Sequence, residues 1–279
     1  MKPIRHQRTE VIGIASGKGG AGKTTVAVNL ALAVQESGAR VMLFDADLGL
    51  ANAPILLGCA CPFNLSHFLR GEKTLAEIAV TTPQGLRLIP GASGNQQLAA
   101  LSAVDAMKIV QAFSDLEEDL DYLIVDMAAG ISPSVLSFMA ASHRRLIVTR
   151  NDPSSIADAY GTIKVLVEDY GLDEIYLVPN AMKSQLDGQL LFHKINRVCA
   201  QFLTRTVHYV GTIERDVLVQ AAHQHLEPLM RYAPTSQAAK DFRLLAHAVT
   251  ELTPLQEMSG TVQFFNDRQT SPVRPFVLH

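Results

Sequence analysis

Short apolar runs alternate with longer stretches of helical periodicity along most of the chain. The runs are rich in β-branched and aliphatic residues, and several are apolar on both faces, which is typical of strands covered by helices on both sides. They span residues 11–14, 41–44, 86–89, 122–125, 146–149, 175–178 and 207–210. The alternation predicts an α/β fold: a doubly wound, mostly parallel sheet with helices on both faces.

Helical periodicity predicts the segments between these strands. The first helix carries Val26, Leu30 and Val34 on one face, begins at Lys23 and ends at Gly38, where glycine can adopt a left-handed cap. Further helices are expected over residues 104–120, 134–142, 155–170, 190–203 and 237–252.

The composition changes after residue 253, where Gly260, Pro272 and Pro275 interrupt the pattern. We therefore expect one domain over residues 1–253 and a C-terminal tail over residues 254–279 that contains at most a short amphipathic segment.

Composition excludes several classes of protein. The chain has 279 residues, is 48% hydrophobic and 18% charged, and carries a net charge of −3, so it suits a folded domain and not a polybasic nucleic-acid or membrane binder. The three cysteines are odd in number and form no CxxC pair, which argues against a disulfide framework and against a four-thiolate cluster. No signal peptide or spanning apolar run is present, and we expect a cytoplasmic protein.

A phosphate-binding loop follows the first predicted strand. The stretch from Gly17 to Thr25 satisfies GxxxxGK[ST], in which glycines let backbone amides turn toward phosphate oxygens at a helix N-terminus. Lys23 is expected to reach the β and γ phosphates, and the Thr24 hydroxyl to bind Mg²⁺. The candidate nucleotide-binding residues of the loop are Gly17, Lys18, Gly19, Gly20, Ala21, Gly22, Lys23, Thr24 and Thr25.

The same stretch also fits the dinucleotide fingerprint GxGxxG, with Asp45 placed as a ribose-binding acid. Lys23 and Thr24 favour a nucleoside triphosphate instead, since a dinucleotide site does not need them, and Asp126 adds a second acid at the end of another strand.

Lys18, two positions into the loop, resembles the signature lysine of the MinD/ParA family of dimerising ATPases. The resemblance implies ATP, Mg²⁺ and a homodimer in the ATP state, in which Lys18 contacts the phosphates of the partner subunit. The stretch after Phe44 resembles the family's first switch, which implies that Asp47 orients the attacking water and that Asp45 supports the magnesium site. Asp126 resembles the Walker B acid that holds magnesium. Lys18, Lys23 and Asp47 are thus the implied catalytic residues, and Thr24, Asp45 and Asp126 the implied metal site.

Two further residues are assigned by the same resemblance. Asp158 matches the carboxylate that keeps the signature lysine within its own subunit, so Lys18 and Asp158 form the implied dimer switch. The alternative is that Ser154 or Ser155 caps the helix and that Asp158 only favours its positive end. Asn180 matches the residue that reads adenine, and its alternative is an ordinary turn asparagine.

Within that family, residues 47–52, 88–94 and 126–134 resemble the flagellar number regulators of the FleN/FlhG group. This implies an ATP-dependent switch that regulates flagellar biosynthesis through a FleQ-like transcription activator or an FlhF-like GTPase. A MinD-like division-site or ParA-like partitioning ATPase is the alternative, and a metabolic phosphotransferase is a third. No sequence-specific nucleic-acid binding is expected. The tail gives two alternatives: weak contact with the inner face of the cell membrane, or packing of Phe264 and Phe265 on the domain.

Overall fold

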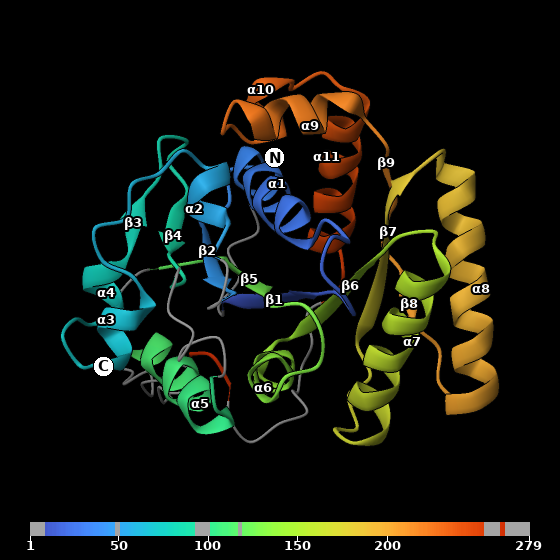
Figure 1. Ribbon diagram of the computed structural model, residues 1–279, viewed down its shortest axis with the longest axis horizontal. Helices are drawn as coiled ribbons and strands as arrows, with labels where there is room; N and C mark the ends of the chain where they lie inside the picture. Colours follow the sequence, from blue (N-terminus) through green and yellow to red (C-terminus); the bar gives the residue numbers. More distant parts are fainter. Residues whose placement is uncertain (1–8, 48–50, 93–100, 117–118, 254–262, 266–279) are drawn as a thin grey trace, which may run out of the picture.

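A mostly parallel sheet runs through the centre of the protein (Figure 1). The computed structural model describes residues 9–47, 51–92, 101–116, 119–253 and 263–265. The strands are β1 (Glu10–Ala15), β2 (Val41–Ala46), β3 (Val80–Thr81), β4 (Arg87–Ile89), β5 (Tyr122–Met127), β6 (Arg144–Thr149), β7 (Ile175–Met182), β8 (His208–Tyr209) and β9 (Ile213–Glu214). Their order is β3-β4-β2-β5-β1-β6-β7-β8, with β9 also paired to β7. Among the described strands only β3 and β4 pair antiparallel.

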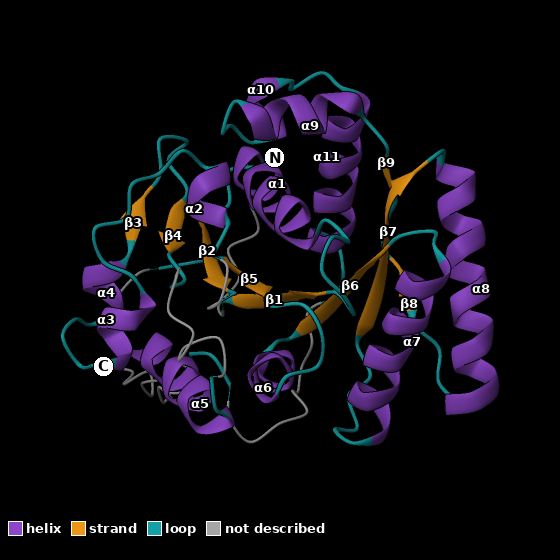
Figure 2. Cartoon of the chain, in the orientation of Figure 1, coloured by secondary structure: helices purple, strands orange, loops and turns teal. Residues whose placement is uncertain are grey.

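Helices cover both faces of this sheet (Figure 2). They are α1 (Lys23–Glu36), α2 (Ala53–Leu56), α3 (Leu65–Leu69), α4 (Leu75–Ile78), α5 (Ala103–Ala112), α6 (Pro133–Ala141), α7 (Pro153–Glu168), α8 (Gln185–Leu203), α9 (Val217–Gln224), α10 (Leu229–Tyr232) and α11 (Gln237–Thr250). Helices α1, α9, α10 and α11 lie on one face, and α5, α6, α7 and α8 lie on the other (Figure 1). The predicted α/β architecture is confirmed.

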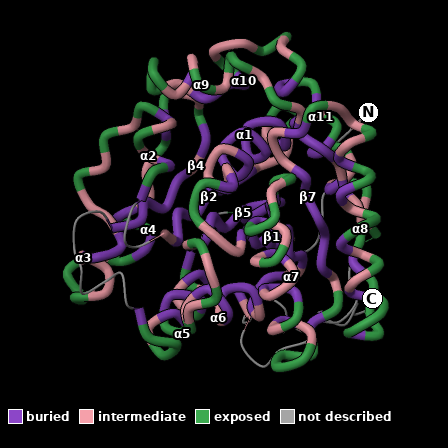
Figure 3. Tube along the Cα trace, turned by 45° about the vertical axis from the view of Figure 1, so that its right-hand side comes forward, coloured by how far each residue is buried: buried purple, intermediate pink, exposed green. Residues whose placement is uncertain are grey.

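The apolar core consists of two layers separated by the sheet. The buried parts of the chain include the central strands of that sheet (Figure 3). Successive strand residues point to opposite faces, so Val11 packs with the α5–α8 side while Ile12 packs with the α1–α11 side. Strands β2, β5 and β6 are buried at every position. Their two-sided apolar character in the sequence therefore reflects the helices on both faces.

Several boundaries differ from the expected ones. Ser184 accepts a hydrogen bond from the Asp187 amide and starts α8 at Gln185, five residues before the predicted start. Helix α5 ends at Ala112 and continues only as a 3₁₀ turn over Phe113–Asp115, so the predicted helix over residues 104–120 is too long. Residues 117–118 of that prediction lie outside the described residues.

Part of the C-terminal tail packs on the α5–α6 side of the core. Phe264 is fully buried and Phe265 nearly so, and the Phe264 ring lies 5.1 Å from the Phe113 ring, centroid to centroid. Phe264 also stacks on Phe138 at 6.4 Å. This bears out the packing alternative for these two phenylalanines, whereas residues 254–262 and 266–279 of the predicted tail lie outside the described residues. None of the helices within the described ranges is long and apolar enough to cross a membrane.

Candidate nucleotide-binding site

The phosphate loop connects the carboxyl end of β1 to the first residue of α1. Gly20 and Gly22 both have positive φ, at 82° and 88°, a conformation in which a side chain would be strained. Gly22 is the N-cap of α1, and no side chain caps that helix. The first amides of α1 are therefore available to an anion at a helix terminus that already favours negative charge.

Two aspartates lie side by side at the bottom of this loop. Asp45 of β2 and Asp126 of β5 are register partners on neighbouring strands, and both are fully buried. Lys23 is also buried, and its Nζ lies 2.7 Å from Asp126 Oδ1. Burial, and then the charge of Asp126, raise the pKa of Asp45 well above its usual value. Burial also raises the pKa of Asp126, although the Lys23 ammonium opposes this shift.

The negative charge of these two acids is incompletely compensated by the protein. One lysine faces two carboxyl groups, and the buried Asp126 Oδ2 has no hydrogen-bond partner among the described residues. The side chain of Thr24, the first residue after Lys23, also acts to lower the pKa of Asp126. An unpartnered carboxylate oxygen beside a threonine hydroxyl and the phosphate loop fits the outer ligands of a hydrated Mg²⁺.

The segment after β2 is folded around the Asp45 carboxylate. Asp45 Oδ1 accepts from the Asp47 amide at 3.2 Å, and Oδ2 accepts from the Ala53 amide at the start of α2 at 3.0 Å. Gly91 lies against this segment, since a Cβ there would come within 2.6 Å of the Asp45 carbonyl oxygen. The structure thus places Asp47 next to the acid pair, although residues 48–50 of the predicted switch lie outside the described residues.

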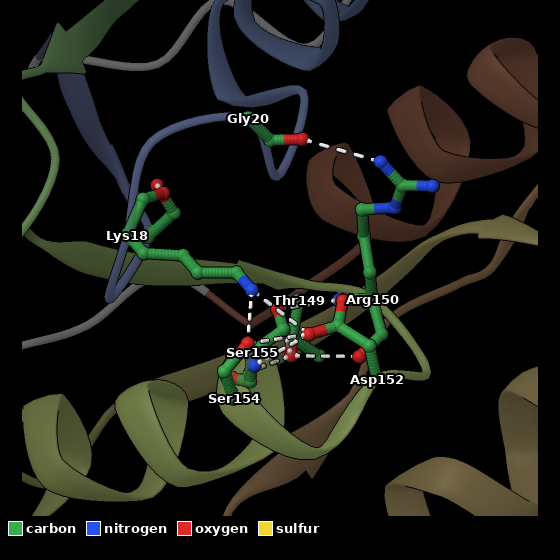
Figure 4. Close-up of polar contacts among 8 residues, drawn as sticks. Lys18, Gly20, Thr149, Arg150, Asp152, Ser154 and Ser155 are labelled. Carbon is green, nitrogen blue, oxygen red and sulfur yellow. Dashed lines mark hydrogen bonds and ion pairs between the residues drawn. The ribbon is translucent and has the colours of Figure 1, made fainter.

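Lys18 is held within its own chain by the loop between β6 and α7 (Figure 4). Its Nζ lies 2.8 Å from Asp152 Oδ1 and also donates to the Ser154 hydroxyl. The hydrogen bond from Lys18, and then that from the Ser155 amide, lower the pKa of Asp152 below its usual value. Lys18 and Asp152 side chains keep 34% and 40% exposure, so this ion pair contributes little to stability and is easily exchanged.

The residue that holds Lys18 is therefore Asp152 and not the predicted Asp158. Asp152 is the N-cap of α7, which puts its carboxylate at the carboxyl edge of the sheet and also corrects the expectation that Ser154 or Ser155 is the cap. Asp158 lies nearly two turns further along α7, where its backbone packs on the phosphate loop: a Cβ at Gly17 would come within 2.3 Å of the Asp158 carbonyl carbon. Position 17 therefore requires glycine, because a side chain there would clash with the Asp158 backbone.

Asn180 lies near the end of β7, in contact with the phosphate loop. Its Nδ2 donates to the Ala21 carbonyl oxygen at 2.8 Å, and its Oδ1 accepts from the Ala181 amide at 2.9 Å. The structure therefore brings the predicted base-reading residue to the loop, and its role toward the base stays a prediction.

The sequence did not predict three contacts that the phosphate loop makes. Asp152 contacts Lys18, Arg150 contacts the Gly20 carbonyl oxygen, and His223 in α9 lies 3.1 Å from the Thr25 hydroxyl. The Asp-Pro-Ser-Ser order is a helix N-cap signature that could have marked Asp152. Arg150 and His223 carry no comparable signal, because only the fold brings them to the loop.

Comparison with known proteins gives the family. The ParA family, described as NUBPL iron-transfer P-loop NTPase, matches residues 7–250. The chain belongs to this family. It is 40% identical over 259 residues to the antiactivator FleN of Pseudomonas aeruginosa, with 93% of this chain and 92% of FleN covered. It is 36% identical over 227 residues to the flagellum site-determining protein YlxH of Helicobacter pylori, covering 81% of this chain and 76% of YlxH.

A solved structure supports the same assignment. The septum site-determining protein MinD from Pyrococcus horikoshii, complexed with Mg-ADP, is 26% identical with a TM-score of 0.73, covering 88% of this chain and 97% of MinD. The predicted family, its flagellar branch and the predicted fold are confirmed, and the chain is an ATPase of the P-loop class.

Proposed function

We propose that this chain is an ATP-dependent dimerising switch that regulates flagellar number through a partner protein. The observation that carries the proposal is its 40% identity to an antiactivator across 93% of the chain, together with the loop lysine that the switch requires. An antiactivator restrains an activator, so a transcription activator of the FleQ type is the partner that we favour. A flagellar GTPase of the FlhF type is the alternative partner.

ATP with magnesium is the ligand that we propose for the site. Lys23, Thr24 and the loop amides would hold the phosphates, and Asp126 would hold magnesium through water, with Asp45 in support. The described residues contain no group of three or more His, Cys, Asp or Glu that could hold a metal ion. We propose that phosphate oxygens and water complete the magnesium shell. When bound, the ion would neutralise charge that develops on the transferred phosphoryl group.

The chain's own residues would couple this site to dimerisation. Lys18 exchanges Asp152 and Ser154 of its own subunit for the triphosphate of a second subunit, where it stabilises the transition state in the manner of an arginine finger. Asp47 orients the attacking water. After hydrolysis Lys18 returns to Asp152, and the dimer surface that the partner recognises is lost.

Flagellar number in cells tests this function directly. Deleting the gene should raise the number of flagella per cell, counted by electron microscopy, and the wild-type chain should restore it. Lys23→Ala should fail to restore it, because the variant cannot hold the nucleotide. As a matched control, Lys183→Ala, which removes an exposed lysine just beyond β7, should restore the normal number.

A division-site role is the second candidate, since the chain is also 28% identical over 253 residues to the septum site-determining protein MinD of Bacillus subtilis. In that case the deletion strain would keep its flagella and would misplace its septa, which the same micrographs show.

A further inference from the structure

Two consecutive carbonyl groups of the phosphate loop are held from outside by side chains at the ends of neighbouring strands. Asn180 of β7 donates to the Ala21 carbonyl oxygen at 2.8 Å. Arg150, the residue after β6, directs its guanidinium at the Gly20 carbonyl oxygen over a longer distance of 3.5 Å (Figure 4). The two side chains therefore act on adjacent peptide groups.

The planarity of the peptide links these contacts to the amides. In a trans peptide the C=O and N–H groups point in opposite directions, so a fixed carbonyl also fixes the amide of the next residue. The Ala21 carbonyl shares its peptide with the Gly22 amide, and the Gly20 carbonyl with the Ala21 amide. Both amides must face away from Asn180 and Arg150, and neither donates to another described residue. Inward amides of this kind are the donors that a phosphate nest requires.

The Asn180 amide is itself rigidly placed. Its Oδ1 accepts a hydrogen bond from the amide of the next residue, Ala181. Ala181 has a left-handed φ of 55°, so the backbone turns immediately after Asn180. On the other side there is no space to spare, because a Cβ at Gly22 would lie 2.3 Å from Asn180 Nδ2. Glycine at position 22 thus allows the amide group to lie directly on the loop.

We propose that Asn180 is a positioning residue for phosphate binding, with Arg150 as a weaker second brace, independently of any contact that Asn180 makes with a base. The inference rests on the proposed triphosphate site. It assigns to Asn180 an effect on ligands that contain no base at all.

Inorganic tripolyphosphate with Mg²⁺ separates this role from base recognition. Its affinity is measured by displacement of a fluorescent ADP, on the full chain. Asn180→Ala should weaken tripolyphosphate binding roughly 3- to 10-fold, the effect of losing one orienting hydrogen bond. Asn151→Ala, which removes an exposed asparagine of the β6–α7 loop, should leave it unchanged. Unchanged tripolyphosphate affinity in Asn180→Ala, with weaker ATP binding, would overturn the positioning role and leave the triphosphate site standing.

Arg150→Ala provides a second test that does not disturb the fold, because Arg150 is exposed. Lys183→Ala is its control, since it removes an exposed positive charge from the end of the neighbouring strand. Arg150→Ala should weaken tripolyphosphate binding about 2- to 3-fold more than the control. If the two variants lose tripolyphosphate affinity equally, Arg150 acts only through its charge, and its role as a brace is overturned. A wild-type chain that binds neither ATP nor tripolyphosphate would instead refute the triphosphate site itself.

Discussion

The buried acids beneath the phosphate loop give the site its pH dependence. An aspartate whose pKa is raised on folding holds its proton more tightly in the folded chain than in the unfolded one. The ligand-free protein therefore loses stability as the pH rises above 3.8, the ordinary value of the aspartate pKa, toward the raised pKa of Asp45. A divalent cation binds the deprotonated form, so it should offset this loss and bind best at the higher pH.

The same acids predict how ADP affinity depends on magnesium. For the wild-type chain, calorimetry should show that Mg²⁺ strengthens ADP binding more at pH 8 than at pH 5.5, because both raised pKa values favour protonated acids at the lower pH. In Asp126→Asn, the factor by which Mg²⁺ strengthens ADP binding should be smaller by roughly tenfold or more. Asp121→Asn, beside the other end of β5, is the control and should retain it. A magnesium effect of the same size in Asp126→Asn would disprove the assignment of Asp126.

Individual residues also show how far a sequence can define the site. The loop glycines, Lys23 and the two strand-end acids are predictable because their chemistry depends on local order along the chain. Asp152 and Asp158 belong to one segment and both carry a carboxylate, so resemblance alone cannot decide which reaches Lys18. The choice depends on the N-cap geometry of α7, which places Asp152 toward the loop and the Asp158 backbone against Gly17.

At the scale of elements, most strands, the short β4 and β8 included, and the long helices follow from the sequence pattern, whereas the short helices do not. Strands such as β5 are buried throughout, and a helix such as α11 is long enough to show a repeating buried face. The helices α2, α3 and α4 have only four or five residues each, too few for a period of 3.6 to be recognised. Strand β3 has two residues and is held by pairing with β4.

The docked tail segment makes a prediction at this scale. Phe264→Ala should lower the free energy of unfolding by about 2 kcal/mol, because it exposes the aromatic surface packed on Phe113 and Phe138. Chemical denaturation measures this loss. Phe202→Ala in α8 is the matched control and should have little effect, since Phe202 is 63% exposed. Equal stability of the two variants would show that Phe264 does not stabilise the domain.

At the scale of the whole molecule, the parallel sheet brings every part of the proposed switch to one edge. The phosphate loop with Lys18 follows β1, and Asp45 and Asp126 lie at the carboxyl ends of β2 and β5. Asp152 follows β6 and Asn180 lies near the end of β7, so segments far apart in sequence meet at this edge. Lys18 is the part that changes partners. Its ion pair with Asp152 is half-exposed and lies at this open edge, where a second subunit can compete for the ammonium group.

The measurement that tests this account most directly is the molar mass of the Asp47→Ala chain with ATP and Mg²⁺, by light scattering after size exclusion. Without hydrolysis the ATP dimer should persist, so we expect twice the 30.3 kDa of one chain. The added substitution Lys18→Ala should return the mass to that of one chain while ATP stays bound. An Asp47→Ala chain that binds ATP and remains at 30.3 kDa, or a dimer that survives Lys18→Ala, would contradict it.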